Sequence, residues 1–386
     1  MALMRTVMHL DMDAFFCSVE VRKNSALQGR PLIIGGHPDR SQSGRGVVAS
    51  CSYEARRYGV HSAMPMRTAL QRCPEATVIS GDTEAYAYYS QMVTDIIAEA
   101  APCFEKASID EFYCDLTGMD RYIGCVKWSG ELGKRIVRET GLSLSYAVSL
   151  NKLIAKMGTS SVKPHGRLHV PARSAPDYIA PLSVRKIPSL GQRTYERLTT
   201  MGVRTIRVLR QIPLRHLEKE FGQPGRSLHQ KARGIDLSPV VPYRERKSIS
   251  TEKTLSVDTT DLPELHARLV RMTERLSFQL RQQGKVTSCV SVRLRYADFN
   301  TVSRQRRIFY SAHDATLLAV VRELFDQLYD RRLLVRMIGV RFSGLVAGHH
   351  QINLFEDTAK VVSLYSAMDA IRARYGVDAV RRAVGR

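Results

Sequence analysis

Three acidic residues stand in stretches that otherwise look like buried β-strands. Asp11 lies in "HLDMDAFF", and Asp110 and Glu111 interrupt "KASIDEFYCDL". Aspartate is depleted in strands and is rarely buried unless it is paired or bound to a metal ion. Two such strands would bring carboxylates to one end of a sheet, where they could hold Mg²⁺ together with phosphate oxygens. Two metal ions about 3.5–4 Å apart can drive phosphoryl transfer, a chemistry that nucleases and phosphatases share.

Basic residues follow at two places and are candidates for holding phosphate groups. "SYEARRYGV" puts Tyr53 and Arg56 near the start of a predicted helix, and "NKLIAKMGTSSVKPHG" offers Lys152, Lys156 and Lys163. Arginine and lysine are the usual partners of a triphosphate. The alternatives are that these residues only decorate helix surfaces, that the acidic pair forms a turn and that Asp11 is salt-bridged.

The elements that must position these residues occupy the first 165 positions. Strands are predicted for the two acidic stretches and for "LSLSYAVS". Helices are predicted for "TEAYAYYSQMVTDIIAEAA" and "KWSGELGKRIVRET", whose apolar residues recur every three to four positions. From 166 to 237 the pattern becomes helical with short turns, and "KIPSLGQRTYERLTTMGV" predicts helix, tight turn, helix. Two prolines and a run of charges at 238–246 predict a linker.

A further compact unit is predicted at 247–345, with the order β-α-β-β-α-β. "TSCVSVRLRYADF" alternates apolar residues with polar ones, and a helix is predicted from about 313 to 328. This order suggests a four-stranded antiparallel sheet with both helices on one face. The open face would carry Arg293, Arg295 and Arg341, and it would suit a phosphate backbone. The fold class is therefore α+β with several domains.

The charge of the chain supports a polyanionic partner. The formal net charge is +21. Residues 1–165 hold 19 Lys and Arg against 17 Asp and Glu, whereas the rest holds 39 against 20, so the excess lies almost wholly in the C-terminal part. This asymmetry indicates nucleic acid, with a merely solvated basic surface as the alternative.

The sequence also gives expectations about location. It has no apolar run of 18 residues and no signal-peptide cleavage site at its beginning, so no membrane association is expected. Seven cysteines, an odd number without a Cys-x-x-Cys pair, are typical of reduced core residues in a cytoplasmic protein.

Four motifs together resemble those of the Y-family translesion DNA polymerases, of the bacterial DNA polymerase IV type. They are "LDMDAFFCSVE", "YEARRYGV", "SIDEFYCD" and "NKLIAKMGTSSVKPHG", in the family's order. The resemblance implies a right-hand polymerase with a catalytic core at 1–165, made of a palm (1–15 and 79–165) and fingers (16–78). A small helical thumb with a helix-hairpin-helix would follow at 166–237, and a little finger at 247–345. The β-α-β-β-α-β order, reached from periodicity, agrees with that little finger.

The resemblance also implies roles for the acidic residues. Asp11 and Asp110 would bind both of two Mg²⁺ ions, and Glu111 would bind the ion at the primer 3′-oxygen. The backbone carbonyl of Met12 would be a further ligand. Asp13 is expected to make a structural hydrogen bond and no metal contact.

Roles in nucleotide binding are implied in the same way. Tyr53, Arg56 and Lys163 would hold the incoming triphosphate. Phe16 would be the steric gate, an aromatic ring that fills the space a ribose 2′-hydroxyl needs. Phe15 is placed in the same nucleotide-binding set, with packing as its alternative role.

DNA contacts are expected from Lys152, Lys156 and the helix-hairpin-helix at Gly191, besides the three arginines of the little finger. The hairpin usually reads Pro-Gly-x-Gly in the family, whereas this chain has Ser189 in place of the first glycine. Such hairpins bind a phosphate at a helix N-terminus.

The tail at 346–386 holds "QINLF", which resembles the peptide by which bacterial polymerases bind the sliding clamp. Gln351, Leu354 and Phe355 would be its anchors; a tail strand covering the core is the alternative. Apolar residues then recur at helical spacing and predict an amphipathic helix packed on the body or on a partner, namely Val361, Leu364, Met368, Ile371 and Tyr375.

The function expected from these features is template-directed, low-fidelity DNA synthesis past damaged DNA by a cytoplasmic monomer. The expected partners are primer-template DNA, deoxynucleoside triphosphates and the sliding clamp. No carboxylate-rich domain for a proofreading exonuclease is apparent. The rival hypotheses are a catalytically silent DNA-damage adaptor of the same fold and a two-metal nuclease, which would need neither Phe16 nor the triphosphate-binding residues.

Overall fold

The computed structural model describes residues 5–36, 45–243, 245–348 and 358–383. The chain divides into two compact units, Met1–Arg244 and Glu245–Arg386, which are considered separately. No helix among the described residues has the length and apolar character that a membrane span requires.

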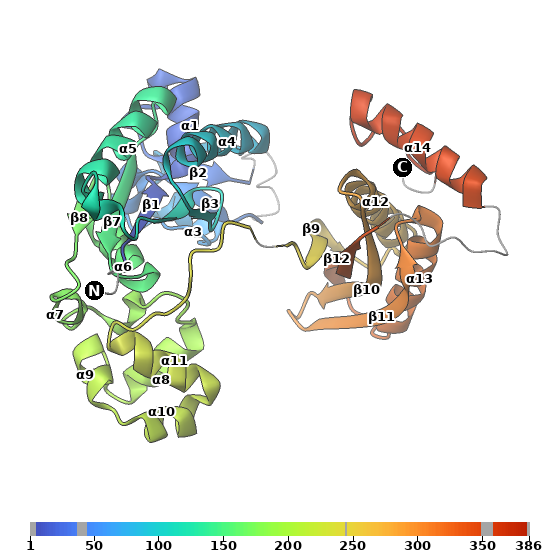
Figure 1. Ribbon diagram of the computed structural model, residues 1–386. Helices are drawn as coiled ribbons and strands as arrows, with labels where there is room; N and C mark the ends of the chain where they lie inside the picture. Colours follow the sequence, from blue (N-terminus) through green and yellow to red (C-terminus); the bar gives the residue numbers. More distant parts are fainter. Residues whose placement is uncertain (1–4, 37–44, 244, 349–357, 384–386) are drawn as a thin grey trace. The chain divides into compact units, whose positions relative to one another are not determined.

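The first unit contains a five-stranded sheet with β1 (Val7–Met12) at its centre (Figure 1). The strand order is β5-β6-β1-β7-β8, and β1 runs antiparallel to both of its neighbours. The other strands are β5 (Phe104–Lys106), β6 (Glu111–Asp115), β7 (Leu144–Ser149) and β8 (Arg167–His169). All six residues of β1 are buried, which explains why its sequence reads as a core strand.

The two faces of β1 have different neighbours, and this difference accounts for the mixed sequence. Met8, Leu10 and Met12 belong to the apolar core, which includes buried residues of the helices α1 (Phe15–Lys23), α4 (Thr83–Ala100) and α5 (Cys125–Thr140). Side chains alternate along a strand, so His9 and Asp11 share the opposite face. There the helix α6 (Lys152–Val162) packs against β1 and β7, and its Thr159 hydroxyl donates to the His9 carbonyl at 3.0 Å.

A small three-stranded sheet and two short helices follow α1. The sheet has the order β3-β2-β4, formed by β2 (Leu32–Gly35), β3 (Val48–Cys51) and β4 (Thr77–Ile79). The helices are α2 (Tyr53–Arg57) and α3 (Met66–Arg72). The Ser52 side chain caps α2 by accepting a hydrogen bond from the Ala55 N–H, which fixes the start of the helix at Tyr53 and places Arg56 within it.

A helical region completes the first unit. It consists of α7 (Ala175–Ile179), α8 (Gln192–Thr200), α9 (Ile206–Gln211), α10 (Leu214–Phe221) and α11 (Gln223–Ala232). Its apolar core is shared with Leu153, Ile154 and Met157 of α6, so the helix that borders the site also anchors this region.

The end of the first unit, which is part of the predicted linker at 238–246, is fixed to the central sheet. Val240 packs with Val7 and Tyr113. The Val241 N–H donates to the Glu105 carboxylate at 2.9 Å, and the same carboxylate binds the Lys152 ammonium at 2.6 Å. Residues 239–241 therefore belong structurally to the sheet.

The second unit has the predicted order β-α-β-β-α-β. Its elements are β9 (Ser248–Thr259), α12 (Leu262–Gln282), β10 (Lys285–Tyr296), β11 (Thr301–Ser311), α13 (Asp314–Leu328) and β12 (Val335–Ala347). The strands form an antiparallel sheet in the order β11-β10-β12-β9. The inward residues Val290, Val292 and Leu294 are buried in one core with α12 and α13. The predicted four-stranded sheet is confirmed.

The last helix, α14 (Thr358–Tyr375), exists where the apolar spacing predicted it but packs through its other face. Leu364 is 57% exposed and Tyr375 66%, whereas Tyr365 and Arg372 are buried. These side chains do not pack on the body, so that alternative is wrong for them, and packing on a partner stays a prediction.

The reason for this packing is a buried ionic network between α14 and its neighbours. Arg281 of α12 binds Asp314 at 2.6 Å and Asp369 of α14 at 2.6 Å. Arg372 lies 3.7 Å from Asp314 and 3.9 Å from Glu274. These charges are buried together, so the polar face of the helix must turn inward.

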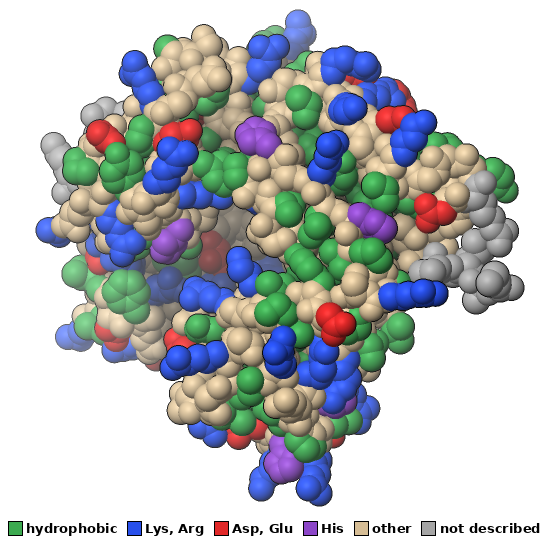
Figure 2. Space-filling model, turned by 90° about the vertical axis from the view of Figure 1, so that its left-hand side faces the viewer, with side chains coloured by type: hydrophobic (Ala, Val, Ile, Leu, Met, Phe, Trp, Pro, Cys, Tyr) green, Lys and Arg blue, Asp and Glu red, His purple; other side chains and the backbone are tan. Residues whose placement is uncertain are grey.

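Positive charge dominates the surface, as the net charge of +21 requires. On the face of the molecule seen in Figure 2, Lys and Arg side chains are spread widely and outnumber Asp and Glu. Such a surface attracts a polyanion over long range.

Candidate active site

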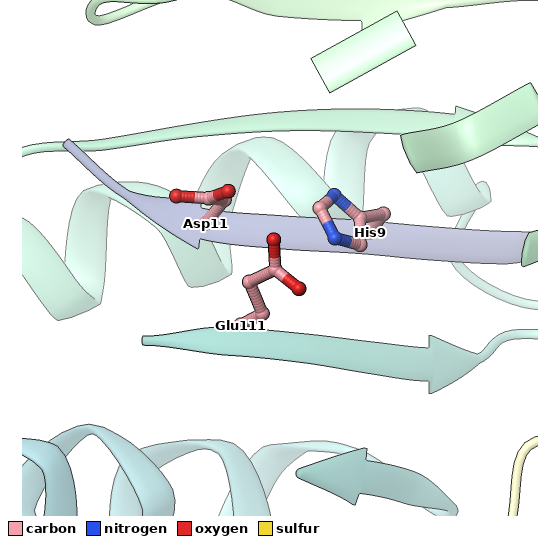
Figure 3. A group of neighbouring side chains, drawn as sticks. All are labelled: His9, Asp11 and Glu111. Atoms are coloured by element: carbon pink, nitrogen blue, oxygen red, sulfur yellow. The ribbon is translucent and has the colours of Figure 1, made fainter. Parts of the chain in front are cut away.

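The three acidic residues singled out in the sequence meet at one end of the central sheet. Asp11 of β1 pairs in register with Glu111 of β6. Asp110 directly precedes β6, and its backbone carbonyl accepts a hydrogen bond from the Met12 N–H at 3.0 Å. In Figure 3 the Glu111 carboxylate points from β6 toward β1, where Asp11 and His9 lie. Two antiparallel strands thus bring together carboxylates that are a hundred residues apart.

Two lysines of the α6 region supply the positive charge that these carboxylates need. The Lys156 ammonium binds both Glu111 carboxylate oxygens, at 2.7 and 2.6 Å. The Lys163 ammonium binds Asp11. Each lysine lies where a cation would bind the same oxygens, so the site is built to bind positive charge.

The electrostatics of Asp11 show the cost of this arrangement. Burial raises the pKa of Asp11 from 3.8 to about 7. The Lys163 ammonium opposes the rise, whereas the neighbouring carboxylates Glu111 and Asp110 add to it. A buried carboxylate among like charges is stabilised by a bound cation. This donor set consists of carboxylate oxygens, the ligands that Mg²⁺ prefers, and it fits Mg²⁺.

Asp13 has the structural role that the sequence predicted. Its carboxylate accepts hydrogen bonds from the Ser145 hydroxyl at 2.9 Å, the His165 N–H at 2.8 Å and the Tyr53 hydroxyl at 3.3 Å. These bonds join β1, β7, α2 and the segment after α6. Asp13 therefore fixes the frame around the site, and the prediction of a structural hydrogen bond is confirmed.

A cavity of about 170 Å³ opens beside the acidic residues. Seven of the predicted site residues line it, namely Asp11, Met12, Phe15, Phe16, Arg56, Asp110 and Lys163. Tyr53 lines a neighbouring cavity of about 430 Å³ together with Asp13 and His165. The structure thus brings the acidic, basic and aromatic candidates together, with Tyr53 on the adjoining side.

The two phenylalanines after the acidic strand point in different directions. Ala14 has a φ of 43°, a left-handed conformation that turns the chain sharply into α1. Phe15 enters the core and is 3% exposed, so its contribution to the cavity wall is small. Phe16 is less buried, and its ring stacks on Tyr86 with 4.3 Å between ring centroids. The stacking holds the Phe16 ring in place.

Arg56 is oriented by two contacts before any ligand arrives. Its Nε donates to the Cys51 carbonyl at 3.2 Å, and its guanidinium lies 4.5 Å from the centroid of the Tyr53 ring. A guanidinium held in this way loses less entropy when it binds a phosphate.

Lys152 does not have the exposed position that a DNA contact requires. It is buried, and its ammonium binds Glu105 at 2.6 Å and lies 4.6 Å from the centroid of the Tyr113 ring. Its partner comes from a distant strand, so the sequence around Lys152 gave no signal of the pair. We assign it a structural role in fixing residues 239–241.

Sequence reasoning missed three residues of this site. Ser145 pairs with Asp11 in register and binds Asp13, Tyr86 supports Phe16, and His9 lies on the face of Asp11. Of these three, only His9 could have been found from the sequence, because alternation along β1 places residues two apart on one face.

The hairpin before α8 has a backbone conformation at Ser189 that suits glycine, the residue that the resemblance led us to expect there. Ser189 has a φ of 65°, the left-handed region that favours glycine. Gly191 precedes α8 as its N-cap residue in an extended conformation. Ser189 therefore pays a conformational cost within the hairpin.

We expect Ser189→Gly to raise stability by about 0.5–1 kcal/mol, because a left-handed non-glycine residue costs about 1–2 kcal/mol and glycine gives back part of this in the unfolded chain. Thermal unfolding of the full chain measures the effect. Ser227→Gly, within α11, is the matched control and should lower stability, since glycine is a poor helix former. Equal shifts in the two variants would contradict the explanation.

The outward face of the second unit carries the three predicted arginines. Arg341 stands opposite Ser291, and Arg293 and Arg295 follow on the same face of β10. Arg293 is already paired, because it binds Glu252 of β9 at 2.8 Å across the intervening β12. Gly339 lies between them, and a Cβ there would be 2.6 Å from Glu252 Cγ, so only glycine leaves room for this pair.

Comparisons with known proteins agree across the chain. Residues 10–160 match the impB/mucB/samB family, residues 246–354 match the C-terminal domain of that family, and residues 185–236 match the thumb domain of DNA polymerase-iota.

Two relatives that match over nearly their full length carry the same name. The DNA polymerase IV of Dehalococcoides mccartyi (strain CBDB1) is 35% identical over 383 residues, which are 98% of this chain and 96% of the relative. That of Halorhodospira halophila is 38% identical over 91% of this chain and 98% of its own length. Among solved structures, a Y-family DNA polymerase chimera aligns with a TM-score of 0.76 and 25% identity, covering 89% of this chain and all of the chimera.

Proposed function

The chain belongs to the Y-family of DNA polymerases, in the group of DNA polymerase IV, and from this membership we propose how its site carries out template-directed DNA synthesis past damaged bases. The observation that carries the proposal is that Asp11, Asp110, Lys163, Arg56 and Phe16 line one cavity, with Glu111 paired in register with Asp11. A silent adaptor would not need this set, and a nuclease would need neither the aromatic ring nor the basic pair.

The acidic residues would hold two Mg²⁺ ions, with Asp11 and Asp110 shared between them, Glu111 at the primer side and the Met12 carbonyl as a further ligand. When bound, the ions supply activation of the primer 3′-hydroxyl and stabilise the charge on the leaving pyrophosphate. The protein contributes by fixing the carboxylates on paired strands, so that no reorganisation is needed when the charge develops.

The basic residues would hold the triphosphate. Lys163 and Arg56 line the cavity, and Tyr53 adjoins it. Lys163 now neutralises Asp11. A cation at Asp11 would release its ammonium for a phosphate oxygen. Lys156 would be released from Glu111 in the same way and become available to the primer strand.

Primer extension with Mg²⁺ and the four deoxynucleoside triphosphates tests this function. The wild-type chain should extend an annealed primer on its template, and Asp110→Ala should not. No extension by the wild type, or equal extension by Asp110→Ala, would contradict the proposal. Degradation of the primer in place of extension would favour the nuclease.

DNA binding would use the outward face of the second unit, the region of Gly191 and Lys156 of α6. Glu252 would compete with the DNA phosphates for Arg293, since the two side chains are 2.8 Å apart and partly exposed. An exposed ion pair is weak and easily exchanged. The arginine can therefore change partner when the phosphate backbone arrives.

We expect Glu252→Gln to tighten binding of primer-template DNA about two- to tenfold at low salt and to steepen the dependence of log K on log salt, because one more cation becomes free for phosphate. A fluorescence titration at several salt concentrations measures both. The matched control is Glu323→Gln, which removes the same charge from a pair with Arg306 on the side of the sheet next to α13. An equal gain in the control would show that net charge alone is responsible.

The clamp-binding residues Gln351, Leu354 and Phe355 lie outside the described residues. We propose that they bind the sliding clamp, on the strength of their sequence and their place after the last strand. The protein would otherwise act as a monomer in the cytoplasm.

Deleting 351–355 should abolish binding to the purified clamp and leave distributive synthesis unchanged, because the catalytic residues lie in the first unit. Fluorescence anisotropy with labelled clamp measures the affinity. Leu364→Ser, on the exposed side of α14, is the control and should bind normally. Retained affinity in the deletion variant would argue against the peptide.

A further inference from the structure

His9 is a buried polar residue that the proposed polymerase reaction does not use. Its side chain is fully buried on β1, and neither ring nitrogen has a hydrogen-bond partner among the described residues. The ring lies against Tyr113, with 4.7 Å between ring centroids. Buried polar groups are normally hydrogen-bonded, so an unpartnered imidazole calls for a ligand or a water molecule.

The surroundings of His9 favour a cation. His9, Asp11 and Glu111 each offer one ligand atom, and these atoms all lie within 4.8 Å of one another. Figure 3 shows the imidazole and the two carboxylates on the same side of the paired strands. In a tetrahedral zinc site two ligand atoms lie about 3.4 Å apart, since each bond is about 2.0–2.2 Å long. Each pair of ligand atoms would therefore have to approach by at most about 1.4 Å to close the site.

The donor set distinguishes between metal ions. Mg²⁺ prefers oxygen donors and gains little from an imidazole. Zn²⁺ and its neighbours in the first transition series bind imidazole well, and one histidine with two carboxylates is a suitable set for them. His9 would thus add a third protein ligand for a transition-metal ion while leaving Mg²⁺ binding to the carboxylates.

We propose that His9, Asp11 and Glu111 form a binding site for a transition-metal dication of the zinc type. The ion would replace the two lysine ammonium groups that now neutralise the carboxylates. Both lysine side chains are partly exposed, 30% for Lys156 and 23% for Lys163, so each can turn toward solvent. A water molecule would complete the coordination.

Such an ion inhibits DNA synthesis, a consequence that rests on the proposed function. It takes Asp11 and Glu111, the carboxylates that the proposed reaction needs for Mg²⁺. Inhibition is then competitive with Mg²⁺, and the affinity difference between the two metals comes from the imidazole of His9.

Zinc binding to the full-length chain, without an affinity tag, DNA or nucleotide, tests the site directly. Competition with a chromophoric chelator gives the Zn²⁺ affinity. We expect one strong site in the wild type and at least a tenfold loss in His9→Phe, whose ring keeps the contact with Tyr113. His216→Phe, at an exposed position of α10, is the matched control and should bind as the wild type does.

A second measurement does not depend on the folding of the variant. Cobalt bound to the wild type should give paramagnetically shifted imidazole proton signals from one histidine, and Zn²⁺ added in stoichiometric amount should remove them. Equal Zn²⁺ affinity in His9→Phe and wild type, together with the absence of these signals, would overturn the site.

Inhibition separates this proposal from the polymerase function. The ratio of primer extension with and without micromolar Zn²⁺ should rise toward one in His9→Phe. If His9→Phe loses zinc binding and the wild type fails to extend primers, the metal site is supported and the polymerase function is refuted. If His9→Phe keeps its zinc affinity and the wild type extends primers, the metal site alone is refuted.

Discussion

Asp11→Asn should abolish primer extension and at the same time make the metal-free protein more stable at neutral pH. The loss of activity should exceed about a thousandfold, because a metal ion supplies several kcal/mol of charge stabilisation and each 1.36 kcal/mol is a factor of ten. The gain in stability follows from burial, which raises the pKa of Asp11 to about 7.

The sign of the stability effect depends on whether the folded or the unfolded state binds the Asp11 proton more tightly. In the unfolded chain Asp11 loses its proton near 3.8, whereas in the folded protein it does so near 7. The folded state therefore binds more protons in this window, and its stability falls as the pH rises from about 4 to 7. Asparagine removes this charge. The net gain in the free energy of unfolding at pH 8 should be on the order of 1–2 kcal/mol, because the loss of the partner of Lys163 offsets part of the effect.

Asp13→Asn is the matched control, two residues further along the chain. Its carboxylate accepts three hydrogen bonds, from Ser145, His165 and Tyr53, and an amide with one oxygen cannot keep them all. We expect this variant to be less stable by about 1–3 kcal/mol at the same pH. Thermal unfolding of both variants between pH 5 and 8 measures the contrast. A loss of stability in Asp11→Asn at pH 8 would contradict the explanation.

Much of the fold could be predicted from the sequence, because the relevant patterns are local. Alternation identified the inward residues of β10, and three-to-four spacing identified the buried face of α12, where Leu265, Leu269 and Leu276 are all buried. The acidic residues were recognisable because aspartate in an apolar strand is costly. Their meeting then follows from the pairing of β1 with β6.

What the sequence did not reveal depends on distant partners. The helix α14 was predicted, but the face that packs was not, because Arg372 is drawn inward by Glu274 and Asp314, which are 98 and 58 positions away. Lys152 was predicted to contact DNA, but it binds Glu105, which lies on a distant strand. Ion pairs between distant segments leave no periodic trace in a sequence.

Phe16→Ala should relax the discrimination between deoxyribonucleotides and ribonucleotides by about ten- to hundredfold. A clash of one extra atom in a well-packed site costs about 1–3 kcal/mol, and alanine removes the ring that causes it. The structure supports a rigid gate, since Phe16 lines the cavity with Arg56 and Lys163 and stacks on Tyr86 at an interplanar angle of 16°. The Tyr86 hydroxyl is itself fixed by Glu20 at 2.8 Å.

The measurement is the ratio of kcat/KM for a deoxynucleotide and the matching ribonucleotide on one primer-template. Phe15→Ala is the control, because that ring lies in the core. It should cost about 3–5 kcal/mol of stability and leave the ratio unchanged. Tyr86→Ala should give an intermediate ratio, since Phe16 keeps its ring but loses its support. An unchanged ratio in Phe16→Ala, or the same change in Phe15→Ala, would show that sugar selection lies elsewhere in the cavity.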